Sequence, residues 1–520
     1  MRKWIALALC LSLCVGLLGC VAENREYVPS GGQLVMDSPV GDATAPTEAA
    51  EEQELTLTIY TDRSTNPFSC NDYTNRTLFS LIYQGLFSVD RNYQAVPMLC
   101  SRYVVSQDMM TYTVYLTEDA TFSDGTRLTI DDVVASYQAA RNSDYYGGRF
   151  THIESFWAEG SAIVFRLTTP MEDLLILLDI PIVKASEVSA EAPLGSGPYT
   201  LHSTITSAYL RRVGNWWCAD DVDLVVTADS IPLEAAENPA QIRDEVEFYD
   251  LDLVCANPCS DLYADFRCDY ELWDCENGEM IFLACNVAHR DMFAGTGLRS
   301  ILTYGIDRET IIEKFYQGFA RAVTLPASTY FPYYSEGLAA KYEYDPEKFA
   351  EELQNVGVPG RELVLLVNGD DTLRLQAARE IANHLTELGL PTTVNAQDHE
   401  NYLAHIFAGN YDMYLGCTRL SSNMDLSAFF GSGGALSYNG IVSSDLYRLC
   451  LDALENHGNY DHLHQEVAED GRLGPLIFCG YAVYATRGLL SDLEPARDNV
   501  FFYTLGRTLE DARIAVDYSS

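Results

Sequence analysis

Short runs of alternating apolar and polar residues mark the first part of the chain. Leu55–Tyr60 and Thr111–Leu116 alternate with a period of two residues, and Ala162–Leu167 forms a third, mostly apolar run. A period of two places alternate side chains on opposite faces of an extended backbone. The pattern therefore predicts β-strands at these three places.

Two helices are predicted among these strands from apolar residues at helical spacing. The first covers about residues 74–85, and the second follows Thr129, whose hydroxyl suits a helix N-cap. Asp131 and Asp132 in the first turn favour the second helix, because carboxylates interact well with a helix N-terminus. The residues predicted to face inward are Leu78, Leu81, Ile82, Val133, Val134 and Tyr137.

The stretch from Leu283 to Asp307 is predicted to be the point where the chain leaves one lobe and begins a second. A short apolar strand ends there at Asn286, and a polar loop follows. A helix then has its apolar residues on roughly one face. These residues are Leu298, Ile301, Leu302 and Ile306. The function is expected in the cleft between the two lobes.

The C-terminal half alternates between helical and strand patterns. Pro346 and Gly389 fit a helix start and a helix end. Helices are predicted over 346–357, 373–388 and 402–407, and strands over 363–367, 391–394 and 411–415. This order predicts a largely parallel sheet, whose ligand side is the carboxyl end of its strands. Leu415–Arg419 lies at such an end and is expected to point at the cleft.

The first twenty residues have the layout of an export signal. Arg2 and Lys3 precede an apolar run, and Leu17-Leu-Gly-Cys20 follows it. This ending resembles the bacterial lipobox, in which the cysteine becomes the lipid-bearing first residue. Residues 21–54 are polar and acidic and are expected to form a flexible tether.

Composition excludes one class of partner. The chain of 520 residues has a formal net charge of −42, which disfavours nucleic-acid binding because phosphates repel such a surface. We interpret the charge as the solubilising surface of an exported protein. The length exceeds that of a single hydrophobic core and predicts two or three domains.

Eleven cysteines remain once Cys10, Cys14 and Cys20 are set aside with the signal and the lipid. An odd number outside the cytoplasm leaves at least one free thiol within a single chain. A group of four is spaced C-x3-C-x8-C-x6-C: Cys255, Cys259, Cys268 and Cys275. Zinc, one or two disulfides, and plain buried thiols are the alternatives, and the spacing lacks the paired C-x2-C of zinc knuckles.

No motif for catalysis is recognisable. The chain lacks a G-x-S-x-G elbow, an H-E-x-x-H helix and a Walker loop. His462 and His464 are two residues apart and are interpreted as part of a solvated helix start rather than as metal ligands. No enzyme activity, metal or cofactor is therefore expected.

An ordered set of motifs resembles the extracellular solute-binding proteins of the oligopeptide and dipeptide transporter type. Its order and spacing extend from about residue 55 to residue 490. The motifs are Ile82–Leu86, Pro97–Leu99, Met110–Leu116, Phe122–Thr126, Leu128–Val134, Gly195–Tyr199, Asn215–Trp217, Asn286, Leu298–Arg299 and Ile306–Arg308.

The resemblance implies an α/β, two-lobed periplasmic-binding-protein-like fold (type II, cluster C) with an extra domain in the N-terminal lobe. The core of the N-terminal lobe would comprise residues 55–88, 193–284 and 488–520. Residues 89–192 would form the additional α+β domain, and residues 285–487 the C-terminal lobe. Residues 1–20 would be the signal peptide with lipidated Cys20, ahead of the tether.

One departure from this family concerns the ligand. In its peptide-binding members, a Gly-Trp-x-x-Asp stretch pairs with the peptide backbone and its Asp holds the α-ammonium. Here the equivalent is Gly416-Cys-Thr-Arg-Leu420, without the Trp or the acid, and Asp425 matches a later position. An unpaired buried ammonium costs about 3–5 kcal/mol. Either another carboxylate supplies the charge, or the ligand is not a peptide with a free N-terminus. Arg419 suits a ligand carboxylate or another anion, with pairing to a neighbouring acid as the alternative.

The resemblance predicts a monomeric, lipid-anchored subunit of an ABC importer on the extracytoplasmic face of a bacterial membrane. It would close on a peptide or another small solute by a hinge motion and present it to the permease. The alternatives are a metal-chelate or haem carrier and a surface sensor or adhesion protein. The residues expected to line or flank the cleft are Asn66, Tyr83, Asn286, Gly416, Cys417, Thr418, Arg419, Asp425 and Tyr484.

Overall fold

The structure, a computed structural model, describes residues 54–514 except 205–206, 261, 264–268, 290–292, 294, 296 and 439. The predicted signal peptide, Cys20 and residues 21–53 of the tether lie outside the described residues, as does Cys268. Among the described residues, no helix combines the length and the apolar character needed to cross a membrane.

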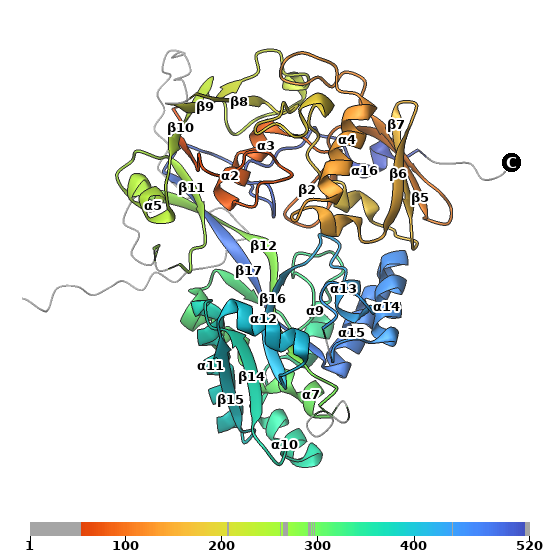
Figure 1. The fold of residues 1–520 in the computed structure, drawn as a ribbon, viewed down its shortest axis with the longest axis vertical. Helices are drawn as coiled ribbons and strands as arrows, with labels where there is room; N and C mark the ends of the chain where they lie inside the picture. The colour runs from red at the N-terminus through yellow and green to blue at the C-terminus, as the bar shows by residue number, and fades with distance from the viewer. Residues whose placement is uncertain are drawn as a thin grey trace, which may run out of the picture. The chain divides into compact units, whose positions relative to one another are not determined.

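A seven-stranded mixed sheet is the largest element of the fold (Figure 1). Its order is β11-β17-β12-β16-β14-β15, with β13 paired to β17. The strands are β11 (Leu253–Ala256), β12 (Tyr270–Cys285), β13 (Ala320–Ala322), β14 (Leu363–Asn368), β15 (Thr392–Gln397), β16 (Met413–Arg419) and β17 (Leu473–Thr486). Only β16, β14 and β15 are mutually parallel, since β12 is antiparallel to both β16 and β17. The prediction of a largely parallel sheet therefore holds for three of the seven strands.

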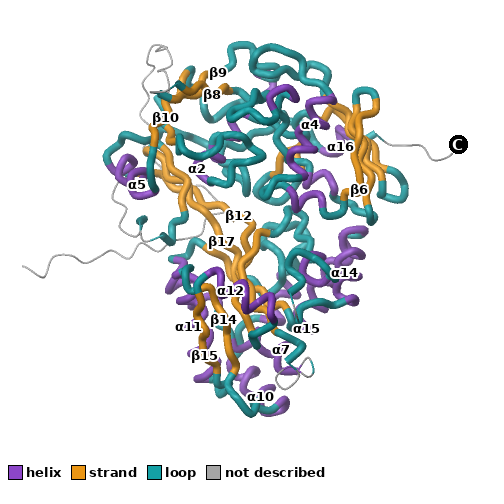
Figure 2. The backbone as a smooth tube through the Cα atoms, viewed as in Figure 1, coloured by secondary structure: helices purple, strands orange, loops and turns teal. Residues whose placement is uncertain are grey.

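Strands β12 and β17 are long and lie side by side (Figure 2). Their pairing runs from Tyr270 opposite Thr486 to Ala284 opposite Leu473, with a bulge at residues 277–279. Gly278 in this bulge has φ +78°, a left-handed conformation that favours glycine. The predicted domain boundaries at 284/285 and 487/488 fall where these two strands end. The boundaries themselves stay a prediction.

Two four-stranded sheets and a hairpin come from the residues assigned to the N-terminal lobe. One sheet has the order β1-β10-β9-β8, and the other, within the predicted additional domain, has the order β4-β5-β7-β6. The first comprises β1 (Leu57–Ile59), β8 (Tyr199–Ser203), β9 (Ala208–Arg212) and β10 (Ser230–Ala235). The second comprises β4 (Cys100–Val105), β5 (Thr111–Leu116), β6 (Ile153–Glu159) and β7 (Ala162–Leu167), and the hairpin comprises β2 (Phe87–Val89) and β3 (Ala95–Pro97).

Helices pack around these sheets, and α11, for example, packs on β14 and β15. Those outside the C-terminal lobe are α2 (Tyr73–Thr77), α3 (Phe79–Ile82), α4 (Ile130–Arg141), α5 (Pro239–Glu247) and α16 (Leu509–Ala512). Those in the C-terminal lobe are α7 (Gly297–Ile301), α8 (Arg308–Ile311), α9 (Glu336–Ala339), α10 (Pro346–Val356), α11 (Thr372–Glu387), α12 (His399–Ala408), α13 (Ser427–Phe430), α14 (Ser444–Glu455) and α15 (Tyr460–Asp470). The four apolar residues predicted to face inward after Asn286 are all buried.

The single helix predicted over 74–85 is instead two short helices, α2 and α3, and it ends early. Tyr83 is already extended, with φ −121° and ψ 146°. The carbonyl of Ile82 accepts a hydrogen bond from the N–H of Gly197 at 2.9 Å rather than from a later residue of its own helix. A tertiary contact thus ends the helix where the local pattern continues it.

Gly195 packs against the same carbonyl. A Cβ atom built there would lie 2.1 Å from Ile82 O, far inside van der Waals contact. We expect Gly195→Ala to lower the free energy of unfolding by about 2–3 kcal/mol, since backbone must shift to admit the methyl group. Gly214→Ala is the matched control, because a Cβ there meets nothing within 4 Å. Equal urea denaturation midpoints for the two variants would contradict this account.

Candidate functional site

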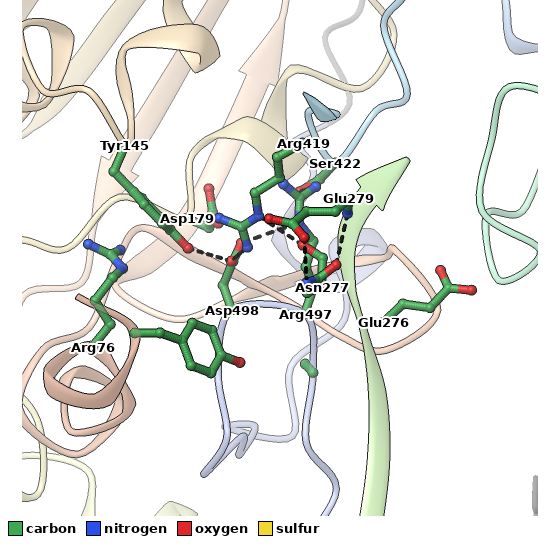
Figure 3. Close-up of polar contacts among 12 residues, drawn as sticks. Arg76, Tyr145, Asp179, Glu276, Asn277, Glu279, Arg419, Ser422, Arg497 and Asp498 are labelled. Atoms are coloured by element: carbon green, nitrogen blue, oxygen red, sulfur yellow. Dashed lines mark hydrogen bonds and ion pairs between the residues drawn. The ribbon is translucent and has the colours of Figure 1, made fainter. Parts of the chain in front are cut away.

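Arg419 and Asp498 form an ion pair between the two lobes (Figure 3). Arg419 is the last residue of β16, and its Nε donates to Asn277 O in the β12 bulge at 2.8 Å. Asp498 lies on the C-terminal segment in a turn closed by two backbone hydrogen bonds between Ala496 and Asn499. The bulge and the turn therefore fix the two charged groups from opposite sides.

Asp498 collects further donors. Tyr145 Oη donates to its Oδ1 at 2.7 Å, and Arg149 Nη2 donates to Oδ2 at 3.4 Å. Arg497 Nε lies 3.6 Å from the same Oδ2. These guanidinium groups hold the pKa of the Asp498 carboxyl well below its usual range, although burial opposes them.

Arg149 connects this site to the additional domain. It belongs to a short 3-10 helix (Gly147–Phe150), and its Nε and Nη2 donate to the two oxygens of Asp179 at 2.6 and 2.7 Å. Both side chains are 8 % exposed. The pair is therefore a buried bidentate contact, the strongest geometry available to arginine and carboxylate.

A fourth arginine completes the group. The Arg76 guanidinium lies 3.2 Å from the centre of the Tyr145 ring and donates to Tyr146 Oη at 2.7 Å and to Cys70 O at 3.0 Å. Arg497 packs its guanidinium on Gly278 and donates to Ser422 Oγ at 3.2 Å. We refer to Arg76, Arg149, Arg419 and Arg497 as the arginine cluster.

A cavity of about 80 Å³ adjoins the arginine cluster. It lies between α2–α3, the additional domain and the C-terminal segment. Its polar lining includes Arg76, Tyr83, Arg149, Asp498 and Asn499. The Oδ1 atom of Asn499 is buried and has no hydrogen-bond partner among the described residues. The cavity therefore combines positive charge with an unused acceptor.

A second polar group lies at the other end of the β12 bulge. Burial raises the pKa of Glu276 to about 7, although a hydrogen bond from Ser328 favours its charged form. Tyr93 Oη donates to Glu276 at 3.4 Å, and Arg321 Nε lies 3.7 Å from it. Glu276 is thus a buried acid that titrates near neutral pH, close to the contact between the lobes.

The comparisons with known proteins were decisive at this point. The family model described as "Bacterial extracellular solute-binding proteins, family 5 Middle" matches residues 94–435. The chain belongs to this family. Its members are extracytoplasmic solute-binding proteins that work with ABC importers.

Three relatives of this solute-binding protein illustrate the range. The glutathione-binding protein GsiB of Salmonella typhi is 21% identical over 361 residues, which cover 64% of this chain and 67% of the relative. The ABC transporter substrate-binding protein CtaP of Listeria monocytogenes matches with TM-score 0.71 and 19% identity, covering 86% of this chain and 97% of CtaP. NikZ of Campylobacter jejuni, solved with Ni(L-His), matches with TM-score 0.62 and 17% identity, covering 88% and 98%. The predicted fold class, α/β and two-lobed with an additional domain, is confirmed.

The structure brings two of the predicted cleft residues to this site. Arg419 belongs to the arginine cluster, and Tyr83 lines the adjoining cavity, where its Oη donates to Thr65 O at 3.4 Å. Cys417 and Thr418 precede Arg419 on β16, where their side chains are half-buried. At Gly416, a Cβ atom would come within 2.4 Å of the Phe282 ring, so the strands pack closely there.

The remaining predicted residues lie elsewhere and make contacts that fix the backbone. Asn66 donates to Val188 O and Ala190 O at 2.9 and 2.7 Å. Asn286 donates to Gly409 O and Tyr411 O at 3.0 and 3.1 Å. The Tyr484 ring stacks on that of Tyr263 with centroids 5.4 Å apart. Whether these residues also contact solute stays a prediction.

Asp425 pairs with a residue of the additional domain. His152 Nε2 lies 2.9 Å from its Oδ2, and Ser427 Oγ donates to the same oxygen at 2.7 Å. His457 makes a second such contact, 3.3 Å from Asp173, and its pKa is raised by that carboxylate despite the opposing effect of burial. Both pairs join the additional domain to the C-terminal lobe.

Sequence reasoning missed most of the site. Four members were not singled out: Arg76, Arg149, Arg497 and Asp498. They are separated along the chain by hundreds of residues and share no spacing or motif. Arg497-Asp498 before Asn499 carried only the local signal of a turn.

The described cysteines do not converge on one centre. Cys259 packs in the core around β14 and α11, whereas Cys275 packs in the core around β1. Burial raises the pKa of each of these thiols to about 12. Among the described residues, all cysteines are free thiols and no group of three metal-ligating side chains occurs.

Proposed function

We propose that this protein is the substrate-capturing lipoprotein of an ABC importer and that it binds a peptide or peptide-like solute between its lobes. Family membership supports the class, and the Leu-Leu-Gly-Cys20 ending supports a lipid anchor. Residues 21–54 would then connect the membrane to the folded body. The permease receives the solute when the lobes open.

The single observation that carries the choice of solute is the edge of β16. Its pairing with β14 stops at Leu415, whereas its pairing with β12 continues to Arg419. Residues 416–419 thus have a strand neighbour on one side only within the described sheet. An extended peptide adds to such an edge through backbone hydrogen bonds, next to the arginine cluster.

Native mass spectrometry of the protein purified without denaturation tests the proposal. We expect a series of adducts at peptide masses that disappears when the protein is unfolded. A single sharp adduct carrying a metal isotope pattern would favour a metal-chelate carrier instead. No adduct, together with no thermal shift across panels of peptides, metals and sugars, would contradict solute capture and favour a sensor or adhesion role.

A further inference from the structure

Positive charge exceeds negative charge at the arginine cluster. Its four guanidinium groups are contacted by only two carboxylates, those of Asp179 and Asp498. The neighbouring Glu279 accepts instead from Asn277 Nδ2 at 3.1 Å (Figure 3). The site therefore holds two more cations than anions in direct contact, within a chain whose formal net charge is −42.

The two carboxylates are unequally shared. Asp179 uses both oxygens in its bidentate contact with Arg149. Asp498 is left as the main counter-ion for Arg419 and Arg497. Arg497 is 4 % exposed, and its Nε has no hydrogen bond among the described residues, with the nearest carboxylate oxygen 3.6 Å away. One buried donor is thus aimed at a carboxylate that does not reach it.

Arg76 has no carboxylate among its printed contacts. It donates to backbone carbonyls and a phenol, and stacks on an aromatic ring. Burying a charge without a counter-ion is costly, and an incoming anion removes that cost. The cavity beside Arg76 has room for a carboxylate-sized group, and Asn499 Oδ1 offers an acceptor to a hydroxyl or N–H of the same molecule.

We propose that the captured solute carries an acidic group, a carboxylate or a phosphate, that binds at the arginine cluster. Asp498 is the internal counter-ion that holds these arginines when no solute is bound. This inference rests on the proposed function and names the class of solute. It also accounts for Arg419 at the point where peptide-binding relatives carry an acid for the α-ammonium.

Two consequences follow. The acidic group of the solute and the Asp498 carboxylate compete for Arg419, so neutralising Asp498 strengthens binding of acidic solutes. Removing the Arg419 charge weakens binding of acidic solutes and leaves neutral ones nearly unchanged. A merely structural ion pair would instead change the affinities for acidic and neutral solutes alike.

The test uses the full chain, purified in detergent and freed of solute. Its probes are an N-acetylated tripeptide library in matched free-acid and amide forms, citrate, and inorganic phosphate. Affinities are measured by isothermal titration calorimetry for the wild type, Arg419→Gln and Asp498→Asn. Arg487→Gln is the matched control, because Arg487 forms an exposed pair with Asp269.

We expect free acids to bind the wild type at least about tenfold more tightly than their amides, since a charge-assisted hydrogen bond is lost in the amide. Arg419→Gln should remove that difference, Asp498→Asn should enlarge it, and the control should leave it unchanged. Phosphate as the only competitor would identify a phosphate-bearing solute, and carboxylates as the only competitors a carboxylic acid.

Equal affinity for acids and amides overturns the inference, as does the absence of binding by every acidic probe. Peptide-mass adducts in the native spectrum would leave solute capture standing in either case, so the two failures are distinguishable. If Asp498→Asn fails to fold, the acid–amide difference in the wild type and in Arg419→Gln still decides. The double variant Arg419→Gln/Asp498→Asn should fold and discriminate no more than Arg419→Gln alone.

Discussion

Arg149→Met is expected to lower the free energy of unfolding by about 3–5 kcal/mol, the cost of breaking a buried ion pair on one side only. The substitution keeps much of the side-chain volume but leaves the Asp179 carboxylate buried, 8 % exposed, without its two charged donors. Asp498 also loses one of its three arginines. Urea denaturation monitored by circular dichroism measures the change.

Two further variants separate the charge from the packing. Arg149→Met/Asp179→Leu removes both charges, and most of the loss should be recovered, because apolar residues of similar volume replace buried pairs well. Arg487→Met breaks the exposed pair with Asp269 and should have no measurable effect. A loss below about 1 kcal/mol for Arg149→Met would mean that water reaches Asp179.

The sequence predicts elements whose pattern is local. The helix capped by Asp345 and ended by Gly357 forms as expected, as does the strand Thr111–Leu116. Strand neighbours are different. The β-α-β order correctly places β14 and β15 in parallel, but β12 and β17 enter the same sheet antiparallel from other parts of the chain. No local period records which strand pairs with which.

The candidate site divides in the same way. Arg419 was recognisable because it follows a predicted strand and departs from a family motif. Arg76, Arg149 and Asp498 carry no such signal, since charged residues in an acidic exported chain are expected at the surface. Their convergence depends on the β12 bulge and the turn at Ala496–Asn499, both of which are stabilised by tertiary contacts.

The bulge at residues 277–279 also explains why the cluster lies where the lobes meet. It interrupts the long pairing of β12 and β17, where Asn277 O receives Arg419 and Gly278 leaves room for Arg497. A hinge motion about these strands would separate Arg419 from Asp498. The counter-ion and the hinge are thus coupled, and an acidic solute that compensates the arginines favours the closed arrangement.

His464→Leu is expected to abolish a large loss of stability in acid. The pair His462 and His464 was interpreted as part of a solvated helix start, and this is wrong for His464, which is fully buried on α15. Neither of its ring nitrogens has a hydrogen-bond partner among the described residues, and burial lowers its pKa to about 3. The ring stays neutral in the folded protein while the unfolded chain binds a proton below about pH 6.5.

The sign follows from linkage. A lowered folded-state pKa gives a contribution that is fully present above pH 6.5 and is lost as the pH falls toward the folded pKa, by about 1.4 kcal/mol per pH unit. At pH 5 the wild type should therefore have lost about 2 kcal/mol through His464 alone. His457 has the opposite sign, because its pKa is raised and its contribution declines above neutral pH. Urea midpoints at pH 7 and pH 5 should converge for His464→Leu by that amount, whereas His462→Leu, at an exposed position on the same helix, should keep the wild-type slope. An unchanged slope in His464→Leu would mean that the ring is protonated in the folded protein and finds a partner there.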